Sequence, residues 1–374
     1  MVNKKIALLV PCLGGGGAER MMANLTKGLA DREFDIDLVL FRKEGIHLNI
    51  IPPSVNIIDL KIDRALFSFW KISRYLKKNK PDAMISTLSR VNIAAVIAKK
   101  ITGVRTRIIL REANTFSIYT KISSGLADKL IYYSARIFYR WADKIVAVSG
   151  GVADDLLAEL KLEESKVRVI YNPVVDEDLF NKAAEKPELE YFVNKTCPVI
   201  MAAGRIAPQK DFPTLIKAFN EVLKEKKCNL VIFGSANVEE GGSPKEFETV
   251  ESLINEFGIK DKVFFPGYEK NIFRYFKNAD LFVLSSQAEG LPGVLIQAIA
   301  CGCPVVSTDC PSGPSEVLDN GKYGSLVKVG DYKSLANEML KTLENPLKPE
   351  VLIERSKDFS TDKSVNQYLE EAIK

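Results

Sequence analysis

Two basic residues follow an apolar run in the second half of the chain. Val199–Ala203 predicts a buried strand, and the turn after it reads Gly204-Arg205-Ile206-Ala207-Pro208-Gln209-Lys210-Asp211. Open parallel sheets bind ligands beyond the carboxyl ends of their strands. Arg205 and Lys210 would lie there, where two cations can stabilise a diphosphate leaving group without a metal. A capped surface loop is the alternative, but the agreement of position with charge favours the anion site.

A carboxylate beside glycines follows another predicted strand, Leu281–Leu284. The next residues read Ser285-Ser286-Gln287-Ala288-Glu289-Gly290-Leu291-Pro292-Gly293 and lead into a helix predicted over 291–300. Glu289 could accept hydrogen bonds from sugar hydroxyls, and the N–H groups at the helix start could bind a sugar or a phosphate. Gln297, two turns into the helix, could reach ribose hydroxyls. Capping of the helix N-terminus is the other interpretation of Glu289.

A glycine-rich turn follows the first predicted strand, residues 6–10. It reads Gly14-Gly15-Gly16-Gly17-Ala18-Glu19-Arg20 and opens a helix. Glycines let the backbone approach a phosphate or a sugar, so Gly15, Gly16 and Gly17 are candidate ligand-binding residues. The turn is not GxGxxG, and no acidic residue ends a clear second strand as a ribose ligand, which argues against a NAD-type dehydrogenase. A tight strand–helix turn explains the glycines equally well.

The order of these motifs resembles a known family over nearly the whole chain. The segments GGGAER, GRIAPQK, FPGY and SSQAEGLPGVLIQAIACGCPVVSTDCPSGPSE are similar to those of the retaining GT-B glycosyltransferases of family four, most specifically within residues 264–330. The resemblance implies two facing Rossmann-like domains with parallel sheets and a cleft between them. It also implies a nucleoside diphosphate sugar donor, bound mainly to the second domain.

The same resemblance implies roles for individual residues. Arg205 and Lys210 resemble the pair that holds the donor diphosphate, and Glu289 resembles the first acid of the E-x7-E motif, which contacts the donor sugar. We therefore expect these three residues to be catalytic. Further binding residues are implied around the sugar, the phosphates and the base: Gly290, Leu291, Pro292, Gly293, Phe265, Gly267 and Tyr268.

The chain departs from the family pattern at two places. Gln297 stands where E-x7-E has its second acid, so it can still bond ribose hydroxyls but carries no charge. Family members often have a histidine near the donor sugar, whereas the one histidine here, His47, is expected in a surface loop. A single histidine also argues against a His-based metal site or a Ser-His-Asp hydrolase. We expect Glu112, in Arg111-Glu112-Ala113-Asn114, to replace that histidine, with Arg111 or Asn114 or a strand-end salt bridge as alternatives.

Apolar strands alternate with amphipathic helices, which predicts an α/β fold with parallel sheets. We expect an acceptor-side domain at 1–175, a polar linker within 172–196, and a nucleotide-sugar-binding domain at 195–360, with a last helix at about 360–374 that packs back on the first domain. Strands are expected at 6–10, 36–41, 83–86, 107–110, 145–148, 167–170, 199–203, 230–233, 263–265, 281–284 and 305–307.

Basic residues gather in the first half of the chain. Residues 61–144 hold 18 Lys and Arg against 5 Asp and Glu. Within them, helices predicted at 66–78 and 125–141 combine bases with apolar stripes, and the second stripe contains Leu130, Tyr133, Ile137 and Trp141. Such helices can rest on an anionic membrane surface or bind the diphosphate of a lipid-linked acceptor. An ordinary core stripe with a solvated edge is the alternative.

Bulk properties constrain the location and the partners. The apolar start of the chain continues directly into a helix and so predicts a first strand rather than a signal peptide. Six cysteines without a regular framework indicate reduced thiols. We expect a cytoplasmic protein that can attach to the inner face of the plasma membrane, with no cofactor, no metal and no nucleic-acid partner.

The sequence as a whole predicts a retaining, metal-independent hexosyltransferase. It would move a hexose or N-acetylhexosamine from a nucleoside diphosphate sugar, with a UDP-sugar favoured by the resemblance, to a lipid-linked oligosaccharide or polysaccharide precursor. Two alternatives stay open. The chain could be a catalytically impaired nucleotide-sugar-binding partner of another transferase, as Gln297 would allow, or a UDP-sugar epimerase-like enzyme.

Overall fold

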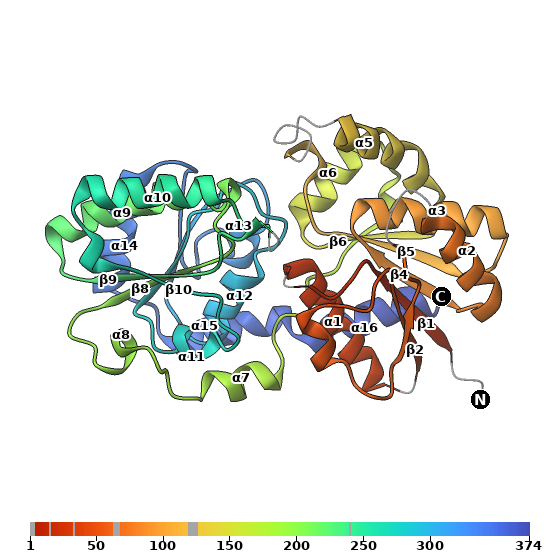
Figure 1. Ribbon diagram of the computed structural model, residues 1–374, viewed down its shortest axis with the longest axis horizontal. Helices are drawn as coiled ribbons and strands as arrows, with labels where there is room; N and C mark the ends of the chain where they lie inside the picture. The colour runs from red at the N-terminus through yellow and green to blue at the C-terminus, as the bar shows by residue number, and fades with distance from the viewer. Residues whose placement is uncertain (1–3, 15, 33, 63–67, 119–125, 239–240) are drawn as a thin grey trace. The chain divides into compact units, whose positions relative to one another are not determined.

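The structure is a computed structural model that describes residues 4–14, 16–32, 34–62, 68–118, 126–238 and 241–374. The chain divides into two compact units (Figure 1). Unit 1 comprises the residues up to Val174 together with Thr361–Lys374, and unit 2 comprises Val175–Ser360. The chain therefore leaves unit 1 once, builds all of unit 2, and returns.

Unit 1 is built on a parallel seven-stranded sheet with the strand order β3-β2-β1-β4-β5-β6-β7. The strands are β1 (Lys5–Val10), β2 (Asp35–Leu40), β3 (Asn56–Asp59), β4 (Ala83–Thr87), β5 (Arg107–Glu112), β6 (Lys144–Ala147) and β7 (Val167–Val169). All five residues of β4 are buried, as expected for a central strand of a sheet covered on both faces.

Helices cover this sheet. They are α1 (Gly17–Ala30), α2 (Ser68–Asn79), α3 (Ser89–Thr102), α5 (Leu126–Phe138), α6 (Gly150–Leu160) and α16 (Thr361–Ala372), with short 3-10 turns at η1 (Ile46–Ile50), η3 (Tyr139–Trp141) and η4 (Glu164–Lys166). Met22, Leu25 and Leu29 recur at helical spacing on α1 and pack with alternate residues of β1 and β2 in one core cluster.

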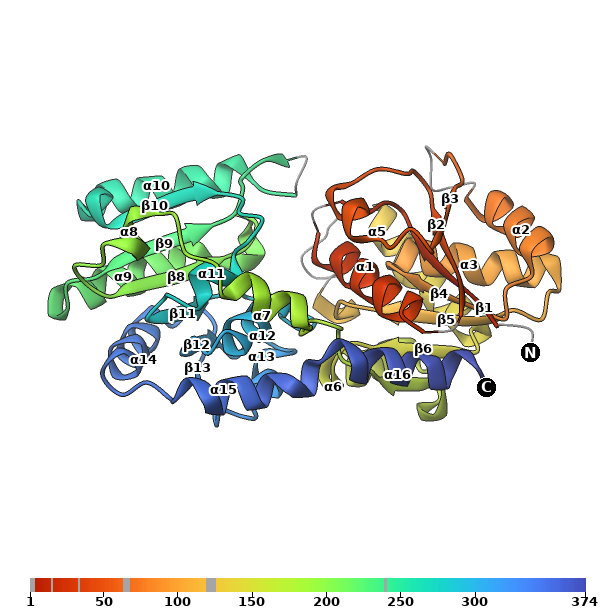
Figure 2. The same cartoon turned by 90° about the horizontal axis from the view of Figure 1, so that it is seen from below.

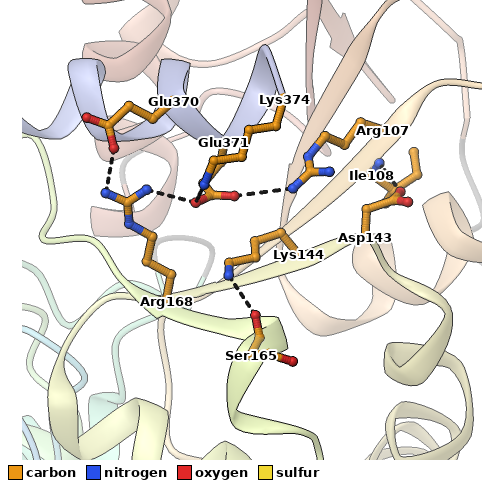
Figure 3. Close-up of polar contacts among 9 residues, drawn as sticks. All are labelled: Arg107, Ile108, Asp143, Lys144, Ser165, Arg168, Glu370, Glu371 and Lys374. Atoms are coloured by element: carbon orange, nitrogen blue, oxygen red, sulfur yellow. Dashed lines mark hydrogen bonds and ion pairs between the residues drawn. The ribbon is translucent and has the colours of Figure 1, made fainter.

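The last helix, α16, belongs to unit 1 and lies along α1 (Figure 2). Gly28 permits this approach, because a Cβ there would lie 2.6 Å from Cγ2 of Val365. Figure 3 shows the polar contacts at the other end of α16, where the buried carboxylate of Glu371 accepts bonds from Arg168 at 2.7 Å and Arg107 at 3.3 Å. Burial would raise the pKa of Glu371, but its bonds to Lys374 and Arg168 outweigh burial and lower the pKa to about 2.

Unit 2 repeats the plan with a parallel six-stranded sheet in the order β10-β9-β8-β11-β12-β13. Its strands are β8 (Val199–Ala203), β9 (Asn229–Phe233), β10 (Val263–Gly267), β11 (Leu281–Leu284), β12 (Val305–Thr308) and β13 (Ser325–Val327). Its helices are α7 (Glu177–Ala183), α8 (Glu190–Val193), α9 (Phe212–Glu225), α10 (Pro244–Phe257), α11 (Phe273–Phe276), α12 (Gly293–Ala300), α13 (Pro314–Val317), α14 (Tyr332–Glu344) and α15 (Pro349–Ser356). The predicted α/β fold with parallel sheets is confirmed.

Three local features differ from the expectation. β3 and β13 were not predicted, and the stretch expected as a polar linker within 172–196 contains the helices α7 and α8 of unit 2. The Asp176 side chain caps α7 by accepting a bond from the Leu179 N–H at 2.9 Å. The first parts of the helices predicted at 66–78 and 125–141 lie outside the described residues.

Candidate functional site

At the carboxyl edge of the unit 2 sheet, glycines stand where β8, β9 and β10 end, so these positions carry no side chains. Gly204, Gly234 and Gly267 occupy those ends. A Cβ on Gly234 would lie 1.9 Å from the carbonyl oxygen of Gly204, so the two backbones meet at a distance that only glycine allows. This edge is where doubly wound sheets bind their ligands.

An ion pair lies beside these glycines. Lys210 follows β8 and Glu289 follows β11, and the two strands are neighbours at the point where the strand order reverses. Lys210 Nζ lies 2.6 Å from Glu289 Oε1, with 16% and 11% of the two side chains exposed. The Ser286 hydroxyl donates to the same carboxylate oxygen at 2.7 Å. A cation and an acid are thus held together at the topological switch point of the sheet.

The two loops that carry this pair are bonded to each other. The Gln209 side-chain amide donates to the Ala288 carbonyl at 2.6 Å, and the Gln287 N–H donates to the Gln209 carbonyl at 2.8 Å. The Ser285 hydroxyl donates to the Lys210 carbonyl at 2.7 Å. These bonds fix both backbones, so the ion pair rests on a preorganised frame rather than on two free loops.

The glycine-containing loop between β11 and α12 is also contacted by the segment that follows β12. The Ser312 hydroxyl donates to the Gly290 carbonyl at 2.9 Å, and Gly313 lies so close that a Cβ on it would be 2.6 Å from Pro292 Cδ. α12 begins at Gly293, where a Cβ would meet open space. Since the first N–H groups of a helix lack intrahelical partners, this start can receive an anion. Gln297, on the same helix, is 7% exposed.

Arg205 and Tyr268 lie at the same edge but outside the ion pair. Arg205 is exposed, and its Nη1 would be 2.4 Å from a Cβ on Gly241. Tyr268 follows β10 and is 52% exposed, whereas the Phe265 ring packs edge-on against Phe247 at 5.2 Å. The structure therefore brings Lys210 and Glu289 into contact and leaves the Arg205 guanidinium at another point of the edge.

Of the glycine-rich turn in unit 1, Gly15 lies outside the described residues. α1 begins at Gly17, where a Cβ would meet open space. On Gly16 a Cβ would be 2.2 Å from a carboxylate oxygen of Glu19, so this acid of the first turn lies against the start of its own helix. An acid at that position is favourable with respect to the helix dipole.

Glu112 ends β5 inside a buried polar network. It is 2% exposed and accepts bonds from the Tyr139 hydroxyl and, at 2.7 Å, from the Asn92 side-chain amide. Burial raises the pKa of Glu112 to about 7. Arg111, also buried, donates to Asn172 at 2.6 Å. Because a substrate atom would have to reach a side chain that is almost completely covered, this geometry favours a positioning role for Glu112 over contact with substrate.

Family comparisons match both units. The family model described as Glycosyltransferase Family 4 matches residues 15–178, and the one described as Glycosyl transferases group 1 matches residues 187–359. The chain belongs to the group 1 glycosyltransferases. The resemblance stated from the motifs is thereby confirmed, as is the GT-B fold class, by the two sheets together with the solved structures that the chain resembles.

Two relatives show what this glycosyltransferase is similar to. The N-acetylgalactosamine-N,N'-diacetylbacillosaminyl-diphospho-undecaprenol 4-alpha-N-acetylgalactosaminyltransferase of Campylobacter jejuni is 29% identical over 353 residues, which cover 91% of each chain. The N-acetyl-alpha-D-glucosaminyl L-malate synthase of Bacillus anthracis is 24% identical and covers 96% of this chain and 93% of its own.

Two solved structures share the fold of the glycosyltransferase. A glycosyltransferase from Rickettsia africae superposes with a TM-score of 0.81 at 19% identity, covering 100% of this chain and 98% of its own. Anabaena HepE, solved in complex with UDP and glucose, superposes with a TM-score of 0.79 at 20% identity, covering 98% and 99%. At these identities the likeness shows the GT-B fold alone.

His47 was expected in a surface loop, and this prediction was wrong. It lies in η1, is 9% exposed, and its Nε2 is buried without a hydrogen-bond partner among the described residues. Gly45, at φ 121°, brings the segment against the turn after β1, where a Cβ would be 1.9 Å from the Leu13 carbonyl oxygen. Burial, with the charge of Arg20, lowers the pKa of His47 to about 4, so the ring is neutral near pH 7.

Proposed function

We propose that this glycosyltransferase transfers a hexose or N-acetylhexosamine from a UDP-sugar to a glycan carried on a lipid diphosphate, with retention of the anomeric configuration and without a metal. The observation that carries the proposal is the Lys210–Glu289 pair at the switch point of unit 2. It offers a cation for a diphosphate and an acid for sugar hydroxyls at one edge of one sheet.

Donor binding would exchange the partners of this pair. A donor phosphate can replace Glu289 as the partner of Lys210, and the released carboxylate can then accept bonds from the hydroxyls of the sugar. Arg205, exposed at the same edge, would add a second charge to the diphosphate. The loop from Gly290 to Gly293, with its open helix start, would receive the remaining phosphate oxygens.

The rest of the nucleotide would lie along α12 and the end of β10. Gln297 would bond ribose hydroxyls through a neutral amide, and Tyr268 is exposed enough to cover a base with its ring. Anabaena HepE, which shares the fold, was solved with UDP and glucose bound, and this supports uridine as the base.

The reaction needs little acid–base chemistry from the protein. The acceptor oxygen forms a bond to the anomeric carbon as the bond from that carbon to the diphosphate oxygen breaks. If the acceptor attacks from the face that the diphosphate leaves, the configuration is retained, and the departing oxygen takes the proton of the acceptor hydroxyl. The main task of Lys210 and Arg205 is then to stabilise the charge that develops on the diphosphate.

The acceptor assignment rests on the relatives and on charge. The name of the Campylobacter relative places its acceptor sugar on diphospho-undecaprenol. The present chain concentrates basic residues between 61 and 144, with 18 Lys and Arg against 5 acids, which suits an acceptor that carries a diphosphate.

The first experiment is thermal unfolding of the purified protein with UDP, GDP, ADP and CMP, each with and without magnesium. We expect UDP to raise the melting temperature without magnesium, because a ligand stabilises the state that binds it. Labelled UDP-sugars should then be transferred to a glycan carried on polyprenyl diphosphate, and NMR of the product should show the anomeric configuration of the donor.

The other outcomes overturn distinct parts of the proposal. An inverted product would exclude retention, and a strict magnesium requirement would exclude metal independence. UDP binding without transfer would indicate a nucleotide-sugar-binding partner of another enzyme. Conversion of the UDP-sugar without any acceptor would indicate an epimerase-like activity.

A further inference from the structure

A stripe of large apolar side chains lies on the outside of α5 and η3. Leu130, Tyr133, Ile137 and Trp141 recur at helical spacing and are 66%, 60%, 57% and 45% exposed. The opposite side of the same segment faces the core, since Ala135 and Tyr139 are fully buried. The apolar stripe is therefore additional to the face that folding requires, and exposed apolar patches of this kind mark interaction surfaces.

Basic side chains border the stripe. Lys129 and Arg140 are exposed. Arg136 is half-buried, and its Cζ lies 5.9 Å from the centre of the Tyr132 ring. From the neighbouring helix, the ammonium of Lys100 lies 5.3 Å from the centre of the Trp141 ring. An aromatic ring with a cation above it therefore places an apolar surface and a positive charge side by side.

The elements next to α5 continue this charge. α2 packs against α3, and α3 packs against α5, so the three helices are consecutive neighbours on unit 1 (Figure 1). α2, α3, α5 and η3 together contain ten Lys and Arg and a single acid, Asp128. α2 also exposes Trp70, at 59%, beside the exposed Lys71 and Arg74. The surface is thus both apolar and strongly basic.

We infer that this surface docks on an anionic lipid bilayer, with the stripe Leu130, Tyr133, Ile137 and Trp141 inserted at the level of the headgroups and the bordering bases on lipid phosphates. An anionic bilayer meets both features at once, because it offers an apolar interior beneath a negative surface. A second copy of the chain would bring basic helices against basic helices, which opposes a symmetric dimer here.

Membrane docking is separate from donor chemistry. Within the described ranges, no helix is long and apolar enough to cross a membrane. Binding to vesicles can be measured without any sugar donor, so its failure would leave the proposed transfer reaction untouched, and the reverse also holds.

The test is co-sedimentation of the full chain with vesicles of phosphatidylglycerol in phosphatidylcholine, and with phosphatidylcholine alone, at low salt. We expect binding to the anionic vesicles only. Removing two bases in Lys129→Gln/Arg140→Gln should weaken the partition about 30-fold, because each base near such a surface contributes about a fivefold effect. Leu130→Ser/Ile137→Ser should weaken it at least about tenfold through lost apolar burial.

The matched control is Val193→Ser/Val238→Ser in unit 2, at positions that are 55% and 67% exposed. It should bind vesicles like the parent chain, and all three variants should keep the parent's melting temperature and UDP response. Absence of binding to phosphatidylglycerol vesicles, or full binding by the Leu130→Ser/Ile137→Ser variant, would overturn the inference. A concentration-dependent dimer that this variant abolishes, with no vesicle binding, would assign the stripe to a second copy instead.

Discussion

Replacing Lys210 by alanine removes a cation that pairs with Glu289 in the structure and, in the proposed reaction, with the donor diphosphate. In the structure Lys210 Nζ lies 2.6 Å from Glu289 Oε1, and the Ser286 hydroxyl bonds the same carboxylate oxygen at 2.7 Å. In the Lys210→Ala protein the carboxylate keeps the hydroxyl but loses the cation. In the reaction, the departing diphosphate loses a charged donor that is already in place.

The size of the effect follows from burial. The two side chains are 16% and 11% exposed, so the pair is mostly desolvated but still touches solvent. Leaving Glu289 partly satisfied should cost about 1–2 kcal/mol of unfolding free energy, which lowers the melting temperature of a unit of this size by about 2–8 °C. Removing one preorganised donor to the leaving group should lower kcat about 10²- to 10³-fold.

The assay is release of nucleoside diphosphate in the presence of acceptor, with melting curves of the same samples. Lys224→Ala is the matched control, since Lys224 pairs with Glu221 at 2.7 Å but is 62% exposed, and such surface pairs contribute little. In Lys210→Ala/Glu289→Gln the two losses should be less than additive, because the side chains share one interaction. A Lys210→Ala enzyme within about threefold of the parent in kcat would refute the reasoning.

Three further predictions concern single positions. Gly293→Ala should raise the melting temperature slightly, because alanine favours helix and its Cβ meets open space, yet weaken UDP binding in calorimetry; unchanged affinity would contradict the open helix start as a phosphate site. Glu371→Gln should lose about 2–3 kcal/mol in urea unfolding at pH 7, a deficit that shrinks as pH falls from about 4 toward 2, because the folded pKa of Glu371 is depressed to about 2; a pH-independent deficit would contradict it. Glu112 has a raised pKa of about 7, so its ionisation lowers the free energy of unfolding as pH rises from about 4 to 7. Glu112→Gln should therefore become more stable relative to the parent over that interval in urea unfolding; a difference in unfolding free energy that stays constant with pH would contradict this.

Most strands could be predicted because each central strand of a parallel sheet is a continuous apolar run. Val199–Ala203 and Leu281–Leu284 were placed to the residue, and the segments that carry Lys210 and Glu289 follow from them. β3 and β13 were not predicted because they are short strands at the edges of their sheets, and most of their residues are only half-buried or exposed. An edge position alone does not hide a strand, since β7 and β10 lie at the other two edges and overlap the strands predicted at 167–170 and 263–265.

The contacts between distant residues could not be predicted. Nothing in the spacing shows that Lys210 meets Glu289, 79 residues later, because the pairing depends on which strands become neighbours. Glu112 was expected at a strand end and is the last residue of β5, but the spacing does not show that its carboxylate is buried among polar partners. His47 was misplaced because the approach of Gly45 to Leu13 is set by the tertiary fold.

Because the chain returns from unit 2 to unit 1, unit 2 is inserted within the sequence of unit 1, and the two units are not arranged in tandem. The two crossings are adjacent, since the Val175 N–H donates to the Phe359 carbonyl at 3.1 Å and Val175 forms a parallel bridge with Ser360. Unit 2 is therefore a continuous segment with neighbouring ends, whereas unit 1 is discontinuous. A stop codon after residue 360 would remove α16, together with the Glu371 ion pairs, from unit 1. Because the ends of unit 2 are neighbours, we expect a fragment of residues 175–360 to fold by itself with Lys210 and Glu289, and a short peptide to join the two remaining parts of unit 1.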